Sequence, residues 1–176
     1  MGHYLKSKKV RQTVQAKAFT LVEILTVLFV ISVAMIGLLA LIVQNIQSQN
    51  FNKYNLIAYQ LAQEGIELVR QVRDSNVNNS LAWDTNLDPG YYYMDYLDIT
   101  PISTTEAAPE TQLYQDSGGF YIHDSGASST PFYRWLEIER LSGLDYASYV
   151  RSTVSWEEHD RSYTYQLETI LYDWRE

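Results

Sequence analysis

Apolar residues are concentrated in one block near the start of the chain. Residues 24–43, ILTVLFVISVAMIGLLALIV, contain no charged residue and no proline. In a helix, about 20 residues at 1.5 Å per residue cross the hydrocarbon core of a bilayer. A helix that is apolar on every face is rarely found in a soluble core. We therefore expect a membrane-spanning helix over residues 19–43.

The helical pattern continues over residues 44–75, but its character changes. Apolar residues now recur at steps of three and four, which is the spacing of one helix face, so this half is amphipathic and needs a partner surface. We expect the helix to end near Asp74, and Gly65 to mark a close approach of the partner. The apolar stripe consists of Tyr54, Ile57, Ala58, Leu61, Gly65, Leu68, Val69 and Val72.

The last part of the chain, residues 132–176, shows the alternation of β-strands. Polar and apolar positions alternate over 132–140, 149–157 and 162–174, and the connectors are short enough for hairpins. This pattern predicts an antiparallel meander whose apolar face is covered by the amphipathic part of the helix. The fold class is then α+β, with a long N-terminal helix packed on a C-terminal antiparallel sheet.

Residues 76–131 read as a loop-rich region between the helix and the meander. This region is rich in Asn, Asp, Ser, Thr, Gly and Pro, which favour turns. We expect short strands over 91–96 and 120–123. Within the second strand of the meander, Val150 and Val154 are expected to lie on one face and Thr153 on the other.

Charge is divided between the two ends of the chain. Residues 1–18 contain five basic residues and no acidic residue; without these five, 8 of the 13 basic residues remain against 21 acidic residues, a net charge of −13. The positive-inside tendency keeps a basic N-terminus in the cytoplasm and places the acidic bulk on the far side of the membrane. An acidic exported domain gives no reason to expect a nucleic-acid partner.

Residue types that carry out catalysis are sparse. The chain has no cysteine, so it has no disulfide and no thiolate metal site. Of its three histidines, His3 lies in the basic segment, and His123 and His159 are expected at turns or on the surface. We expect no catalytic residues and no cofactor.

One loop offers a weak candidate for a metal site. Asp84, Asn86, Asp88 and Asp95 place acids and amides in a pattern that partly resembles a calcium-binding loop. Pro89 stands where such a loop needs glycine, and Asp95 stands where a bidentate glutamate is preferred. A solvated turn before a Pro-Gly pair explains these residues better, so we expect no metal.

The start of the helix carries a recognisable motif. The segment Ala18-Phe19-Thr20-Leu21-Val22-Glu23 follows the basic leader and precedes the apolar block, and it resembles the corresponding segment of type IV prepilins and pseudopilins. The resemblance implies that a prepilin peptidase cuts between Ala18 and Phe19 and then N-methylates Phe19. The family usually has glycine before the cut, and Ala18 keeps a small residue there.

Glu23 is a single acid at the edge of an otherwise apolar span. An ionised side chain costs roughly 2.5–3.5 kcal/mol at the centre of a span, so a partner is expected. Cleavage would create a positive amine at Phe19, four residues earlier, on the same chain or on a neighbour. The resemblance favours the neighbour. Gly37 is expected to be a close-packing site between helices or a point of local unwinding.

The resemblance implies a structural role. The chain would be a subunit of a type IV pilus or pseudopilus, held first in the cytoplasmic membrane with its N-terminus inside and later in an extracellular filament. Its partners would be identical or related pilin subunits, the prepilin peptidase and the pilus assembly machinery. The alternative is a single-pass, membrane-anchored extracellular binding or sensor module that does not polymerise.

Overall fold

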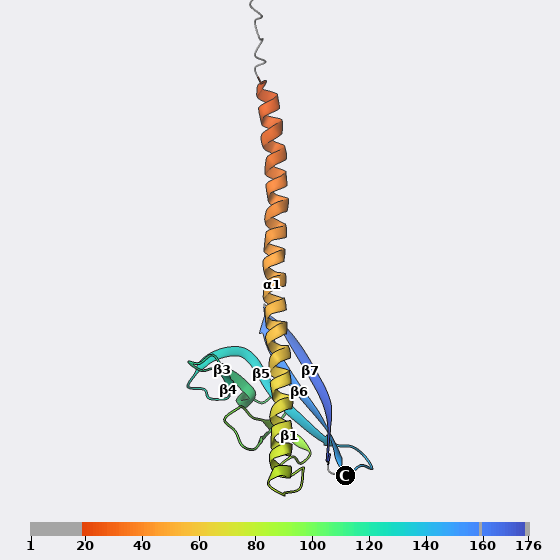
Figure 1. Ribbon diagram of the computed structural model, residues 1–176. Helices are drawn as coiled ribbons and strands as arrows, with labels where there is room; N and C mark the ends of the chain where they lie inside the picture. Colours follow the sequence, from red (N-terminus) through yellow and green to blue (C-terminus); the bar gives the residue numbers. More distant parts are fainter. Residues whose placement is uncertain (1–18, 159, 175–176) are drawn as a thin grey trace, which may run out of the picture. The chain divides into compact units, whose positions relative to one another are not determined.

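The chain contains one long helix and one antiparallel sheet, an α+β fold as predicted. The computed structural model describes residues 19–158 and 160–174. The described residues form two compact units, one that ends at Gln47 and one that begins at Ser48. The helix α1, Leu21–Asn78, begins in the first unit. The second unit, called the head below, contains the remainder of α1 packed on the sheet (Figure 1).

Seven strands form the sheet, and every pair of neighbouring strands is antiparallel. β6 pairs with β5 on one side and with β7 on the other. The other edge of β5 is shared, because β3 pairs with its first half and β1 with its second half. The described strands are β1 (Gly90–Tyr93), β2 (Ile102–Thr104), β3 (Gln112–Gln115), β4 (Tyr121–Ile122), β5 (Ser128–Arg140), β6 (Ala147–Glu158) and β7 (Arg161–Tyr172), with a short 3-10 helix at Pro109–Thr111.

The predicted meander is confirmed with corrected boundaries. β5, β6 and β7 are consecutive hairpin partners, and the pairing of β6 with β7 runs without interruption from Ala147 opposite Tyr172 to Glu158 opposite Arg161. β5 begins at Ser128, earlier than predicted. In the loop-rich region the first strand ends at Tyr93 rather than residue 96, and β2 and β3 were not predicted.

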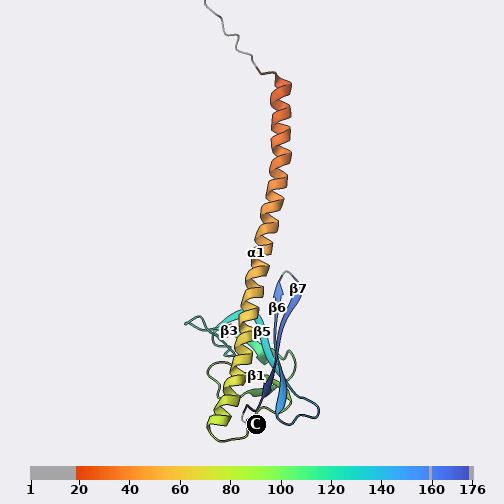
Figure 2. The same ribbon diagram turned by 45° about the vertical axis from the view of Figure 1, so that its right-hand side comes forward.

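The amphipathic half of α1 covers one face of the meander, as its stripe predicted. The buried side of the helix packs against inward-facing residues of the long strands; the two views in Figures 1 and 2 show α1 lying over them. Burial of a large apolar side chain contributes about 1.5–3 kcal/mol, so this layer stabilises the head substantially. The buried helix residues are Ala58, Leu61, Ala62, Gly65, Ile66, Leu68, Val69, Val72, Asn76 and Val77.

The helix ends four residues later than predicted. Ser80 adopts a left-handed conformation (φ 59°), the Ser80 N–H donates to the Val77 carbonyl, and the Leu81 N–H donates to the Asn76 carbonyl at 2.9 Å. These bonds form a Schellman-type C-cap, which usually has glycine at the left-handed position. Because serine stands there, the sequence did not mark the helix end.

The burial of two positions was not predicted. His123, expected at a turn or on the surface, lies at a bend directly after β4, but its side chain is only 5% exposed. Thr153 lies on the opposite face of β6 from Val150 and Val154, as predicted, but it is 1% exposed and lies opposite the buried Trp135 on the sheet face turned away from α1. Both faces of the sheet therefore contain buried positions, which simple alternation does not predict.

Gly65 is the point where the helix and the sheet approach most tightly. A Cβ at this position would overlap Ser152 Oγ and lie 3.0 Å from Leu136 Cδ2. Alanine normally stabilises a helix interior by about 1 kcal/mol relative to glycine. Here the overlap outweighs that gain, so we expect Gly65→Ala to lower the head's free energy of unfolding by about 1–3 kcal/mol in chemical denaturation.

A second substitution checks the cause of this loss. Ser152 Oγ is buried without a hydrogen-bond partner, so Ser152→Ala should cost little by itself and should relieve part of the Gly65→Ala penalty. Gly37→Ala is the matched helix control, because no described residue outside its own stretch of helix lies within 4 Å of its Cβ position. Additive losses in the double variant would refute the proposed overlap.

Candidate functional site

The first part of α1 exposes a continuous apolar surface. Its large apolar side chains, from Phe19 to Ile46, are between 49% and 76% exposed. Over the described residues, one helix near the N-terminus is long and apolar enough to cross a membrane, and none of that window is buried. An apolar surface of this size is normally covered by lipid or by other protein. The segment therefore fits a membrane anchor by length and composition.

Glu23 lies in the first turn of α1, and its backbone N–H takes part in capping the helix N-terminus. The Thr20 hydroxyl oxygen accepts a hydrogen bond from the Glu23 N–H at 3.2 Å, and the Thr20 carbonyl accepts from the Ile24 N–H at 3.2 Å. Thr20 is thus the N-cap residue and Glu23 is at N3, which are the residue types and the spacing of a capping box, with the bond from the Glu23 N–H to the Thr20 hydroxyl formed. A negative charge there also complements the helix dipole. This role was readable from the T-x-x-E spacing, but the sequence interpretation missed it.

Of the other residues predicted for processing and assembly, the structure describes Phe19 and Gly37. Ala18 and the basic leader lie outside the described residues. Phe19 directly precedes the N-cap, and its side chain is 76% exposed. Among the described residues beyond its own stretch of helix, none lies within 4 Å of the position that a Cβ would occupy at Gly37, so the described part of the chain supplies no close packing there.

Two of the candidate calcium residues, Asp84 and Asp95, are engaged in separate contacts. Asp84 pairs with Arg140, whose guanidinium stacks over the Trp83 ring. The Asp95 carboxylate instead accepts hydrogen bonds from the N–H groups of Leu97 at 2.9 Å and His123 at 3.0 Å. Within residues 19–158 and 160–174, no group of three or more His, Cys, Asp or Glu side chains is placed to hold a metal ion.

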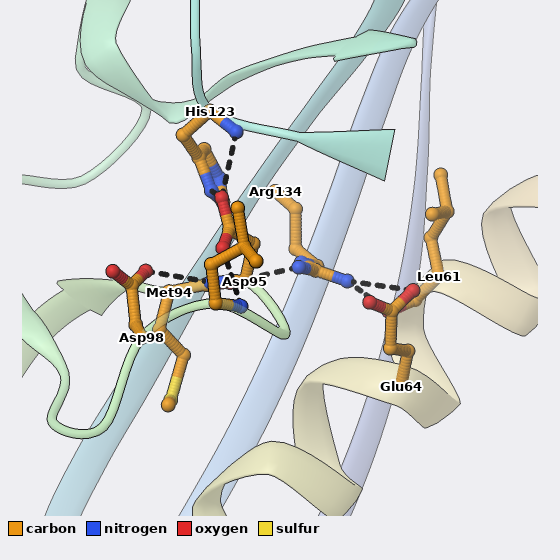
Figure 3. Close-up of polar contacts among 8 residues, drawn as sticks. Leu61, Glu64, Met94, Asp95, Asp98, His123 and Arg134 are labelled. Atoms are coloured by element: carbon orange, nitrogen blue, oxygen red, sulfur yellow. Dashed lines mark hydrogen bonds and ion pairs between the residues drawn. The ribbon is translucent and has the colours of Figure 1, made fainter. Parts of the chain in front are cut away.

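A buried polar cluster joins three parts of the head (Figure 3). Arg134 on β5 is 1% exposed, and its guanidinium donates to the Leu61 carbonyl on α1 at 3.2 Å and to the Met94 carbonyl after β1 at 2.8 Å. Glu64 lies 3.3 Å from the same guanidinium. Burial lowers the pKa of Arg134, and the charge of Glu64 opposes this effect. Arg134 therefore ties α1, β5 and the loop after β1 together.

His123 is the second unusual member of this cluster. Burial, reinforced by the positive charge of Arg134, lowers the pKa of His123 to about 4, although Asp95 opposes the shift. The imidazole is therefore neutral at pH 7, and its 3.7 Å separation from the Asp95 carboxylate is not an ion pair. The ring packs against Tyr93 with a centroid distance of 4.9 Å.

The bonding of the cluster indicates a structural role. A buried histidine beside a carboxylate, with a shifted pKa, can mark an active site. Here Arg134 and Asp95 direct their hydrogen bonds to backbone groups of α1, of the loop after β1 and of His123. The cluster therefore holds separate segments of the head in place.

Comparisons with known proteins do not assign this chain to a family. No family model, no curated protein and no solved structure matches it. A functional proposal must then be based on the chain itself. It can use the N-terminal motif, the exposed apolar segment of α1 and the structure of the head.

Proposed function

We propose that the chain is a structural subunit of a type IV pilus or pseudopilus, cleaved and N-methylated by a prepilin peptidase and assembled through the first part of α1. The observation that carries the proposal is the position of the helix start. The N-cap Thr20 lies one residue beyond the proposed cut between Ala18 and Phe19, and an uncovered apolar helix follows at once. Cleavage there would release a helix that is already capped and ready to pack.

Glu23 has a physical role in such an assembly. A cut before Phe19 would leave a positive amine at the N-terminal end of the helix dipole, where positive charge is unfavourable. The Glu23 carboxylate, in the first turn, would compensate it. In a bundle of apolar helices both charges are desolvated, so pairing between subunits strongly favours one axial position of each incoming helix.

This assignment gives each part of the chain a location. The subunit would first lie in the cytoplasmic membrane with its N-terminus inside, and the head would face the far side. It would then move into a cell-surface filament beside identical or related subunits, with the peptidase and assembly machinery as transient partners. The chain itself would catalyse no reaction.

Mass spectrometry of the mature N-terminus tests the proposal directly. We expect the chain isolated from cells to begin at Phe19 and to carry one methyl group on its α-amine. An intact leader in mature cells would contradict the proposal and favour a membrane-anchored binding or sensor module. Electron microscopy of sheared surface material then tests whether the cleaved subunit forms filaments.

Charge removal at Glu23 tests the assembly step separately. Glu23→Gln keeps an amide of similar shape at N3 but removes the charge, and we expect assembled material to fall by about tenfold or more, since each 1.4 kcal/mol changes an equilibrium tenfold. Glu67→Gln is the matched control, because Glu67 is also a helical acid but has a side chain that is 64% exposed on the head. Equal assembly of the two variants would refute the role of Glu23.

A further inference from the structure

The first residues before α1 lie next to the proposed cleavage point. α1 begins at Leu21, and the two described residues before it, Phe19 and Thr20, are outside the helix. The proposed cut is the peptide bond that joins Ala18 to Phe19. Only two residues therefore separate this bond from the helix.

No helix-breaking residue explains why α1 begins at this position. Residues 3–36 contain neither proline nor glycine, the two residue types that most disfavour a helix. The segment before the cut, VRQTVQAKA at residues 10–18, consists mostly of Ala, Arg, Gln and Lys, which are good helix formers. Once a helix exists, each added residue gains a hydrogen bond without a new nucleation cost. The position of the helix start therefore needs another cause.

Thr20 supplies such a cause through its cap. Its hydroxyl oxygen accepts a hydrogen bond from the Glu23 N–H at 3.2 Å, and its carbonyl accepts from the Ile24 N–H at 3.2 Å. If the helix extended toward the leader, the Glu23 N–H would bond instead to the carbonyl of Phe19, four residues earlier. The capping bond and the extension of the helix therefore compete for the same donor.

Extension of the helix would protect the bond that is to be cut. With one more residue in the helix, the Val22 N–H would bond to the carbonyl of Ala18, which is the carbonyl attacked in the proposed cleavage. In that reaction water adds to this carbonyl, the C–N bond breaks, and the products are a carboxylate at Ala18 and an amine at Phe19. Proteolysis acts on locally open backbone, so a helical bond would have to unwind first.

We propose that Thr20 is a positioning residue for this cleavage, an inference that rests on the function proposed above. Its cap ends the helix at Leu21 and keeps the bond between Ala18 and Phe19 accessible to the peptidase. Thr20 acts through the backbone conformation that it sets and not as a side chain that the peptidase recognises.

Alanine and glycine at position 20 distinguish these two roles. Neither side chain can accept a hydrogen bond, and the two differ by one methyl group. Alanine is the best helix former and a poor N-cap, whereas glycine disfavours a helix and is nearly as good an N-cap as threonine. A peptidase that recognises the threonine side chain would discriminate against both variants. A peptidase that needs the helix to end would discriminate against alanine alone.

The rate of cleavage in the producing cells tests the proposal. Pulse-labelled full-length chain is followed over time by mass spectrometry, which measures the fraction that begins at Phe19. We expect Thr20→Gly and Thr20→Ser to be cut as fast as wild type, and Thr20→Ala to be cut about fivefold more slowly because the cap is lost. Thr26→Ala is the matched control, since the Thr26 hydroxyl donates to the carbonyls of Val22 and Glu23 inside the helix and caps nothing.

A second measurement needs no peptidase. The Cα chemical shift of Phe19 in the uncut chain, recorded in detergent micelles, reports whether this residue is helical. We expect the shift to move toward the helical value in Thr20→Ala and to stay at the wild-type value in Thr20→Gly and Thr26→Ala. Recognition of the side chain by the peptidase would produce no such change.

The outcomes separate this inference from the proposed function. Equal cleavage of wild type and Thr20→Ala, or equally slow cleavage of Thr20→Ala and Thr20→Gly, would overturn the positioning role while cleavage at Phe19 still stands. An unchanged Phe19 chemical shift in Thr20→Ala would overturn it as well. Wild type that is never cut would overturn the proposed function, and the role of Thr20 in cleavage with it.

Discussion

Arg134→Ala is expected to lower the head's free energy of unfolding by about 3–5 kcal/mol. Removing the side chain leaves the buried Met94 carbonyl without its charged donor and leaves a cavity between α1 and β5. Domains of this size are stable by only about 5–15 kcal/mol, so a large fraction of the head would unfold under mild denaturation. Urea titration of the full chain in micelles, followed by tryptophan fluorescence, measures the loss.

Arg151→Ala is the matched control for this prediction. Arg151 also forms ion pairs, to Glu137 and to Glu168, but its side chain is 29% exposed and it lies on the solvent face of the sheet. Because these pairs remain in contact with solvent, the loss should be smaller than for Arg134→Ala. Arg134→Lys should lie between the two variants, because a single ammonium cannot reproduce the planar fork of donors. Equal losses for Arg134→Ala and Arg151→Ala would refute the structural role assigned to the cluster.

The sequence predicted the elements whose hydrophobic period is long and regular. The stripe of α1 and the alternation of β5, β6 and β7 each repeat over a dozen residues or more. A repeat of this length allows the period of a helix, 3.6 residues, to be told from the period of a strand, two residues. The short strands β2 and β3 have no such repeat. They exist because β5 offers an edge to the returning chain, which is a tertiary cause.

The candidate sites were predictable to different degrees. Arg134 falls on the same face of β5 as Phe132 and Leu136, so alternation alone places it inward. Its partners at Leu61 and Met94 lie 73 and 40 residues away in sequence, and no local pattern connects them. The burial of His123 was missed for the same reason, because His123 lies directly after β4 and is covered through contacts with Asp95 and Tyr93, which are distant in sequence.

Acidification is expected to destabilise the head through His123. Its pKa is about 4 in the folded head, below the value of 6.5 for an unperturbed histidine, so the unfolded chain binds the proton more readily. The stabilisation from the neutral imidazole is therefore complete above about pH 6.5 and declines as the pH falls toward 4. A difference of about 2.5 pKa units corresponds to about 3 kcal/mol at most.

His123→Phe separates this contribution from that of the carboxylates, which also titrate as the pH falls. Phenylalanine keeps a ring against Tyr93 but cannot be protonated, and neither imidazole nitrogen has a hydrogen-bond partner whose loss would add a cost. Denaturation curves collected between pH 7 and 4 should therefore show a shallower decline for the variant. The charged groups around the ring, Asp95 and Arg134, are the same in both proteins, so the difference between the two slopes measures the imidazole alone. Parallel pH profiles would mean that His123 takes up its proton without penalty in the folded head, and the burial assigned to it would then be wrong.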